Sequence, residues 1–299
     1  MSTKSPHPAP PLALDSAQRG EGPYIWRFSL YHRITHATVI VSFFLLVITG
    51  LPLRFSEAFW AAPLMSLLGG VKMAGLLHRL GAIMTFGYFG AHLAFLLRKI
   101  IAAPDPMKMF WGPDSLVPQP RDIVDFWNQV RWYFGQGPRP RFTRWSYMEK
   151  FDYFAVFWGV GIIGGSGLLL WFPEFFARYI PGWVFNVATI VHADEALLAS
   201  GFIFTIHFFH VHFRPEKFPL DAVMFTGRAT KAYMEEEHPL IMDQIEAHEH
   251  EEPSFAQVTD TPAPPPGRTA SLVAAALGFA AVAVGLALTG MILWAVILY

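Results

Sequence analysis

The chain has no cysteine among its 299 residues. This absence excludes disulfide bonds, cysteine-held zinc, iron–sulfur clusters and covalently attached c-type haem within the chain. Charged residues are scarce as well, at 15% of the sequence, against about 25% in an average soluble domain. A net charge of -1 gives no basis for a nucleic-acid partner. With 53% hydrophobic residues and a mean hydropathy of +0.35, the composition is typical of a protein of the lipid bilayer.

Five long apolar runs account for this composition. Each has about 20 residues or more, enough at 1.5 Å per residue to cross a hydrocarbon core of about 30 Å. Because a bilayer admits only helices or closed barrels, helix-length runs predict an all-α transmembrane protein. The runs cover residues 34–53, 75–97, 153–172, 187–213 and 270–299.

The chain divides into four parts around these spans. Residues 1–23 are rich in proline, serine and small residues, which predicts a disordered cytoplasmic tail. Residues 24–232 contain the first four spans and predict a four-helix transmembrane bundle. Residues 233–268 are acidic and then proline-rich, which predicts a cytoplasmic linker. Residues 269–299 supply a fifth, C-terminal transmembrane helix beyond that linker.

Lysine and arginine predict the orientation. Nine lie between the second and third spans, four before the first and five between the fourth and fifth, whereas the other two connections hold two and one. Because cytoplasmic loops carry the excess of positive charge, the N-terminus and the second and fourth connections are expected in the cytoplasm. The C-terminus is then expected in the periplasm, in the inner membrane of a bacterium.

Histidines lie inside the spans, where ionisable groups are costly and usually functional. His78 and His92 are 14 residues apart in the second span, so they share a face about 21 Å apart in depth. His192 and His207 are 15 residues apart in the fourth span, about 60° past whole turns, with a rise of about 22 Å. The two spans therefore present histidines at matching depths. Paired imidazoles at each depth predict haem iron, because haem suits the interior of an apolar bundle.

Two further questions stay open at this stage. His36, one turn into the first span, competes with His92 as the partner of His207. A third haem is open too, because His210 lies 18 residues after His192 on the same face, while His212 lies about 200° around and is expected to face away. Histidines that hydrogen-bond between helices are the alternative to haem altogether.

Companion residues suit a haem protein or a close-packed bundle equally. Arg33 and Arg79 stand beside His36 and His78, where they would pair with haem propionates or extend to lipid headgroups. Glycines of the third span leave room for a porphyrin or for a neighbouring helix. They are Gly159, Gly161, Gly164, Gly165 and Gly167.

Several short motifs carry a family resemblance. They are Arg33-Ile-Thr-His36 with Thr49-Gly50-Leu51, Leu77-His78-Arg79 with Gly81, Ile190-Val191-His192, His207, and Thr226-Gly227-Arg228 followed by Glu237-His238-Pro239. Across about residues 26–245 the chain resembles the cytochrome b (gamma) subunit of respiratory formate dehydrogenases and nickel–iron hydrogenases. The sequence around His192 and over Val211–Pro219 is similar to that of relatives associated with multihaem c-type cytochromes.

The resemblance implies two haems b. His78 and His192 would hold the outer haem, and His36 and His207 the inner one, with a ubiquinone or menaquinone beside it. It also implies an electron-transfer subunit between the quinone pool and a periplasmic partner, either a c-type cytochrome or an iron–sulfur or catalytic subunit. The chain departs from the family in the added His92, in the 15-residue spacing of the fourth span and in the fifth span.

Polar residues at the cytoplasmic end of the fourth span are the candidates for the quinone headgroup. They are His210, His212 and Glu216. No substrate-level catalytic residue is predicted, so the chain is expected to be a subunit of a membrane oxidoreductase complex. Two other functions stay open: a stand-alone haem b quinone reductase with a diffusible donor, and a proton-coupled transporter or anchor without haem.

Overall fold

The computed structural model describes residues 23–214, 217–218, 220–246, 258–259 and 267–298. Five helices in these residues are long and apolar enough to cross a membrane, so the protein is a multi-pass membrane protein, and the predicted all-α bundle of four spans with a fifth is confirmed. The spans are α2 (Leu30–Arg54), α4 (Gly70–Ala102), α7 with η1 and α8 (Tyr147–Gly159, Val160–Gly164, Gly165–Trp171), α10 with η2 and η3 (Trp183–Phe202, Ile203–His207, Phe209–Phe213), and α14 (Arg268–Leu298).

The spans extend beyond the apolar runs, and in the third span a capping box accounts for the extension. The third span starts at Tyr147 rather than near residue 153. Ser146 Oγ accepts from the Glu149 backbone N–H, and the Glu149 carboxylate accepts from the Ser146 backbone N–H at 2.7 Å. This reciprocal capping box stabilises the first turn of α7, so it brings Asp152 inside the span.

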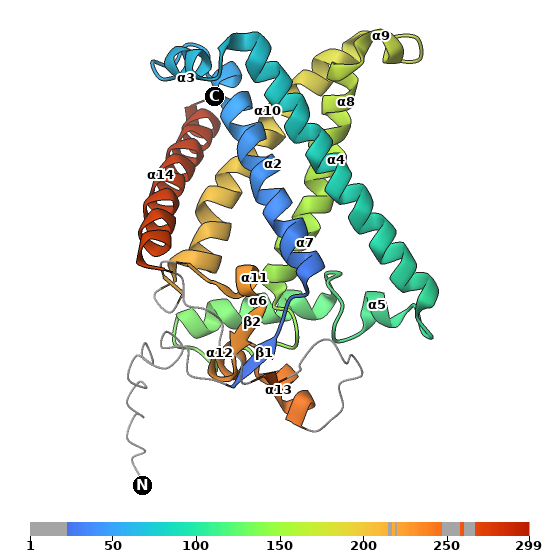
Figure 1. The fold of residues 1–299 in the computed structure, drawn as a ribbon, viewed down its shortest axis with the longest axis vertical. Coiled ribbons are helices and arrows are strands. Elements are labelled where there is room, and N and C mark those ends of the chain that lie inside the picture. Colours follow the sequence, from blue (N-terminus) through green and yellow to red (C-terminus); the bar gives the residue numbers. More distant parts are fainter. Residues whose placement is uncertain (1–22, 215–216, 219, 247–257, 260–266, 299) are drawn as a thin grey trace.

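The remaining elements gather at the two ends of the bundle (Figure 1). The short helices α3 (Ala61–Leu67) and α9 (Pro173–Phe176) lie at one end, where α14 also finishes. The other end carries what we call the cap. It consists of β1 (Tyr24–Trp26), α5 (Lys108–Trp111), α6 (Pro120–Tyr133), α11 (Val223–Thr226), β2 (Arg228–Thr230), α12 (Lys231–Glu237), α13 (Pro239–Glu246) and β3 (Val258–Thr259). The connections predicted to share one side of the membrane therefore do so.

A three-stranded antiparallel sheet in the order β2-β1-β3 joins distant parts of the chain within the cap. Tyr24 pairs with Thr230, more than 200 residues later. The turn before β2 needs Gly227, whose φ is +81° and whose added Cβ would lie 2.5 Å from the Phe28 carbonyl oxygen. Only glycine adopts this left-handed conformation at so close an approach without strain.

Residues 233–246, expected as the start of a linker, are packed into the cap. Met234, Ile241 and Met242 are buried against Ile25 and Ala229. The physical reason is the spacing of the apolar residues, which puts them on the inner faces of α12 and α13 while Glu235 and Glu236 are exposed. The predicted tail and most of the proline-rich part of the linker, residues 1–22, 247–257 and 260–266, lie outside the described residues.

Buried ion pairs join the cap to the spans. The Arg27 guanidinium, nearly inaccessible to solvent, contacts the Glu149 carboxylate at the start of α7. Arg214, at the end of the fourth span, binds Glu237 of α12 through two hydrogen bonds. Burial opposes the charge on Glu237, but Arg214 and the nearby Lys217 outweigh it and hold the pKa of this carboxyl well below its usual range.

The fifth span packs closely on the fourth. A Cβ added at Gly285 would lie 2.7 Å from Phe204, and one at Gly278 would overlap Phe213. Phe204 is buried with Ala281 and Leu288. Small residues therefore let α14 approach α10 and η2 directly, as in other transmembrane helix pairs.

Acidification is expected to loosen the cap through His238. Burial and the nearby charge of Arg27 lower the pKa of His238 to about 4 in the folded cap, against about 6.5 for an exposed histidine. The opened cap therefore binds the proton first, and the free energy of opening falls as the pH drops from about 6.5 to about 4, by about 3 kcal/mol in total. Amide hydrogen exchange at Ile25 and Ala229, measured in nanodiscs across this range, reports the loss.

His238→Gln is the matched control for this measurement. The amide keeps a donor for the Thr143 carbonyl, which accepts from His238 Nδ1 at 2.8 Å, but it does not titrate. The variant should lose the part of the pH dependence that falls between about pH 6.5 and 4. The same pH dependence in both proteins would show that His238 is not the group responsible.

Candidate functional site

His78 of α4 and His192 of α10 face each other near the end of the bundle opposite the cap. Their ring centroids are 6.2 Å apart with an interplanar angle of 66°. Imidazole nitrogens bind metal ions at about 2 Å, so a metal shared by two rings separates the bonded nitrogens by about 4 Å. The spacing between the rings leaves room for that separation. The structure thus brings together the pair that the sequence predicts for the outer haem.

Each of these rings is anchored at Nδ1. Thr49 Oγ1 donates its hydrogen to the Leu45 carbonyl at 2.6 Å and therefore accepts from His78 Nδ1, 2.9 Å away. The Ile163 carbonyl accepts from His192 Nδ1 at 2.9 Å. Both rings carry their proton on Nδ1 and present the lone pair of Nε2. This arrangement, with the second nitrogen held by a neighbouring group, is usual for histidines that bind metals.

Two glycines make space for these rings. A Cβ added at Gly167 of α8 would lie 3.0 Å from His192 Cε1, and one at Gly50 of α2 would lie 3.4 Å from His78 Cε1. Gly164 instead admits Phe86 of α4, at 3.1 Å. An added Cβ at Gly161 or at Gly165 would meet no atom of the described chain within 4 Å. Of the glycines in the third span, Gly167 therefore makes room for an outer histidine and Gly164 for the contact with α4.

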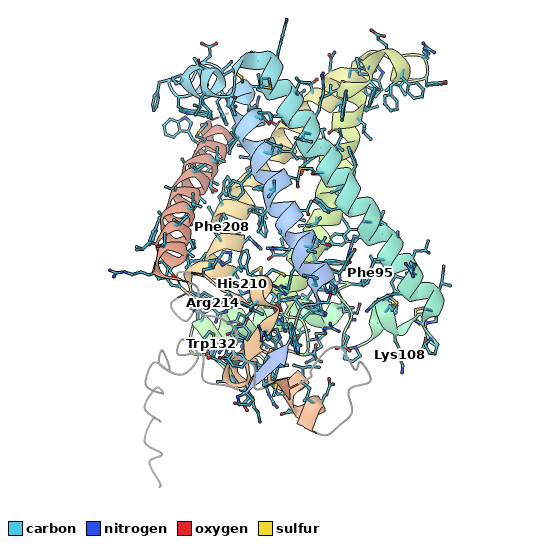
Figure 2. All side chains as sticks on the ribbon, in the orientation of Figure 1. Phe95, Lys108, Trp132, Phe208, His210 and Arg214 are labelled. Atoms are coloured by element: carbon cyan, nitrogen blue, oxygen red, sulfur yellow. The ribbon has the colours of Figure 1, made fainter. Side chains whose placement is uncertain are left out.

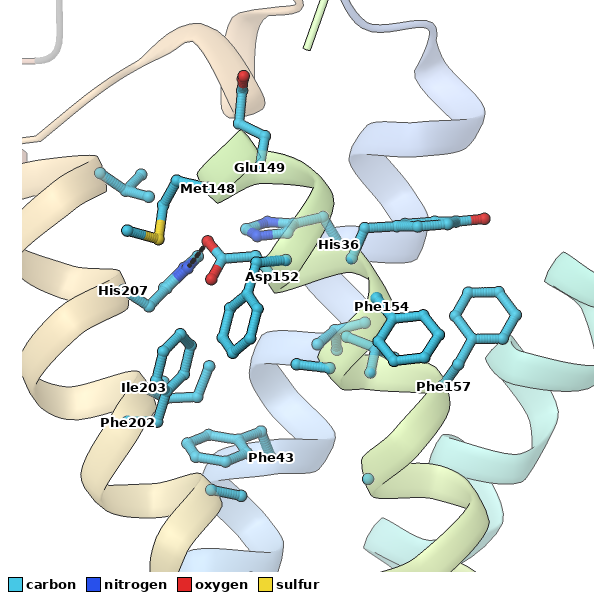
Figure 3. Close-up of a pocket in the computed structure, with 18 of the residues that line it drawn as sticks. His36, Phe43, Met148, Glu149, Asp152, Phe154, Phe157, Phe202, Ile203 and His207 are labelled. Carbon is cyan, nitrogen blue, oxygen red and sulfur yellow. Dashed lines mark hydrogen bonds and ion pairs between the residues drawn. The ribbon is translucent and has the colours of Figure 1, made fainter. Parts of the chain in front are cut away.

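His36 and His207 lie near the cap end of the same bundle. His207 Nδ1 donates to Asp152 Oδ2 at 2.9 Å (Figure 3). Figure 3 shows His36 of α2 beside this pair on the wall of the cavity. The other carboxylate oxygen, Asp152 Oδ1, is buried and has no hydrogen-bond partner among the described residues.

The end of the fourth span is π-helical, and this changes which way its histidines face. A π-helix, with its i→i+5 bonds, turns less per residue than an α-helix. Through η2 and η3 the span therefore brings His212 to the cavity wall with His36 and His207, so the expectation that His212 faces away is wrong. His212 Nδ1 accepts from the Asp221 backbone N–H at 3.3 Å. His210 lines the cavity at the cap end of the helix (Figure 2).

His92 lies between two tyrosines. Its Nε2 is 2.8 Å from the Tyr153 hydroxyl of α7, and its Nδ1 is 3.3 Å from the Tyr31 hydroxyl of α2. Phe95 stacks on the ring and Phe157 meets it edge-on. With both nitrogens facing hydroxyls, His92 is less available to a metal than His36.

The two arginines predicted near the haems differ in their surroundings. Arg79 lines the cavity beside His78, with its guanidinium over the Trp171 ring at 5.8 Å. Arg33 Nε donates to the Phe225 carbonyl of the cap at 2.6 Å. Glu216, the acidic candidate for the quinone headgroup, lies outside the described residues.

One continuous cavity of about 4190 Å³ runs through the bundle. A pocket for a drug-sized ligand has about 300–1,000 Å³, so this partly open space is several times larger than such a pocket. Its wall includes His36, His78, His192 and His207. Within the described residues, no three His, Asp or Glu side chains gather where they could hold a metal ion. A metal bound by either pair would need further ligands, which a porphyrin supplies.

Two cavity residues, Asp152 and Tyr153, are not predicted from the sequence, and neither is Tyr31, whose hydroxyl faces His92. Tyr31 and Asp152 lie just outside the apolar runs, and Tyr153 is the first residue of one. The signal that points to Asp152 is the capping box at Ser146, which extends the third span backwards. Neither a family model nor a curated protein matches the chain.

The Nδ1 anchor makes a prediction about tautomers in the haem-free chain. Histidine labelled with ¹⁵N should show His78 and His192 with the proton on Nδ1. Thr49→Val removes the hydroxyl acceptor at His78 Nδ1, keeps the volume of the side chain and leaves the Leu46 carbonyl as the remaining acceptor, so only His78 should shift in part towards the Nε2-protonated form. An unchanged His78 signal in this variant would mean that Thr49 does not select the tautomer.

Proposed function

We propose that the chain is a membrane di-haem cytochrome b that carries electrons between a quinone and a redox partner at the end opposite the cap. The observation that carries this proposal is the presence of two histidine pairs, His78 with His192 and His36 with His207. They come from facing spans, lie at two depths of one continuous cavity, and three of the four rings have Nδ1 held by a neighbour. Two depths matter because electrons can then cross the membrane in steps.

The proposed ligands are His78 with His192 for the outer haem and His36 with His207 for the inner haem. Haem supplies one-electron chemistry at iron, which no side chain of this chain provides. The protein contributes the fixed orientation of the imidazoles, and the Asp152 carboxylate holds the Nδ1 proton of His207, which leaves Nε2 to bind iron. Arg79 offers a positive charge at the cavity wall for the outer propionates.

The resemblance to gamma subunits supports the same assignment, and the surroundings of His92 favour His36 as the inner ligand. His92 would have to give up a hydrogen bond to a tyrosine in order to bind iron. His36 needs no such exchange in order to share the cavity with His207. We therefore propose two haems b, with no third haem at His92.

The partner is proposed to be a c-type cytochrome or an iron–sulfur subunit. This chain has no cysteine to hold either group itself, so electrons must pass to another protein. The proposed side is the periplasm of a bacterium, since the cap end carries the positive connections and cytoplasmic loops are positively charged. The quinone is proposed to act near the inner haem, at the cap end of the cavity.

Replacement of single histidines tests the ligands. His78→Ala and His192→Ala should each remove the same haem, and His36→Ala and His207→Ala should each remove the other. A pyridine haemochromogen assay, together with redox titration, should count two haems in the wild type and one in each variant.

His32→Ala, one turn before His36 and hydrogen-bonded to Ser29, is the matched control and should keep both haems. His92→Ala should also keep both. Loss of a haem in His92→Ala but not in His36→Ala would assign the inner site to His92. A wild type without haem would leave the transporter or anchor as the better explanation.

The orientation is testable because the chain has no cysteine of its own. Cysteine introduced at Glu57, exposed near α3, should react with a membrane-impermeant maleimide in intact spheroplasts. Cysteine introduced at Gln136, exposed in the cap, should react only after the membrane is opened. The opposite pattern would place the cap in the periplasm.

A further inference from the structure

Tyr31, His92 and Tyr153 form a chain of hydrogen bonds across three spans. Tyr31 stands in the first turn of α2 at the cap end, His92 in the lower half of α4, and Tyr153 in the second turn of α7. His92 Nε2 and Nδ1 face the two hydroxyls at 2.8 and 3.3 Å. The haem assignment uses none of the three residues.

Tyr31, His92 and Tyr153 have three donor protons but only two hydrogen bonds between them, so one proton is available to another group. A neutral imidazole has one N–H donor and one acceptor nitrogen, and each hydroxyl has one proton. If His92 donates to Tyr31, Tyr153 donates to His92, and the proton of Tyr31 is available to another group. In the opposite tautomer it is the proton of Tyr153 that is available. A change of tautomer therefore moves the available proton from one end of the chain to the other.

The cavity beside these residues has the shape of an amphiphile site. His92 and Tyr153 lie on its wall, and beyond them the cavity continues along the cap-side half of α4. This part of the wall is mostly apolar, with Phe95, Leu96, Ile100, Met109 and Phe110, and also holds the charged residues Lys99, Asp105 and Lys108 (Figure 2 labels Phe95 and Lys108). A small oxygen-bearing head at Tyr153 with an apolar tail along α4 matches that wall. A quinol has this form.

We propose that Tyr153 and His92 bind the headgroup of the quinone, and that Tyr31, His92 and Tyr153 relay its protons to the water at the cap. This inference rests on the proposed function, because the two electrons of the quinol need the proposed haems as acceptors. It places the headgroup on α4 and α7 rather than at His210 and His212.

When a quinol is oxidised, each proton that it releases enters the relay at Tyr153 and one proton leaves the relay at Tyr31. The O–H bond of the quinol breaks and its proton passes to the Tyr153 oxygen, while the hydroxyl proton of Tyr153 moves to His92 Nε2. The proton on His92 Nδ1 moves to Tyr31, whose own proton leaves to water. Before the second proton follows, the hydroxyls rotate and His92 returns to the tautomer that carries its proton on Nδ1. The proposed haems would take up the two electrons, which leaves the quinol oxidised to a quinone. Reduction runs the same steps in reverse.

The test uses the full chain in nanodiscs, with decylubiquinol as the reductant and a quinolone N-oxide as a redox-inactive analogue of the quinone. Tyr153→Phe should slow haem reduction by about 100-fold, the usual contribution of a positioned proton-transfer group. It should also weaken analogue binding by about 2- to 10-fold, the usual effect of one hydrogen bond. Tyr31→Phe should slow reduction without changing analogue affinity, because it removes the proton exit but no contact with the headgroup.

Tyr88→Phe is the matched control. Tyr88 lies one turn from His92 on α4 and lines the same cavity, so loss of its hydroxyl should change neither quantity. Haem spectra identical to the wild type establish that each variant is folded. If the wild type is reduced by the quinol and both Tyr153→Phe and Tyr31→Phe behave like it, the relay is wrong and the proposed function stands. If the wild type itself holds no haem or is not reduced, the proposed function fails.

Discussion

The hydrogen bond at Nδ1 decides what each cavity histidine is able to do. A neutral imidazole has a single proton, so a partner at Nδ1 leaves the lone pair on Nε2. Thr49, the Ile163 carbonyl and Asp152 are such partners, and they come from the first and third spans. His92 shows the contrast, since hydroxyls face both of its nitrogens. The same residue type thus has two kinds of surroundings in one bundle.

So large and partly open a cavity leaves part of the bundle's interior unfilled by its own side chains. Among the described residues, one buried apolar cluster lies in the cap, and a second lies where α14 meets the fourth span, with Phe204 packed against Phe43 and Phe44 of α2. The ion pair of Arg27 with Glu149 and that of Arg214 with Glu237 then join the spans at one end. Breaking a buried pair of this kind by removing one partner costs about 3–5 kcal/mol. The loss of either partner should therefore weaken the attachment of the cap to the spans.

The spans and the depths of their histidines follow from the sequence, because hydropathy and helical rise are local properties. The direction in which His212 faces does not follow, since it depends on the π-helical segments η2 and η3. Sequence spacing also gives no access to contacts such as Asp152 with His207, which join different helices. The packing of Met234 and Ile241 in the cap is hidden for another reason: their segment is so acidic that its composition resembles that of a linker.

The pairing of β1 with β2 has a consequence for biogenesis. β1 precedes the first span, and its partner follows the fourth, about 200 residues later. At a synthesis rate of about 5–20 residues per second, the cap stays unclosed for roughly 10–40 s after β1 has been made. The first four spans are synthesised during that interval, so the sheet does not yet close the cap end of the bundle. Closure of the sheet is therefore a late step of assembly, and it follows the synthesis of all four spans of the bundle.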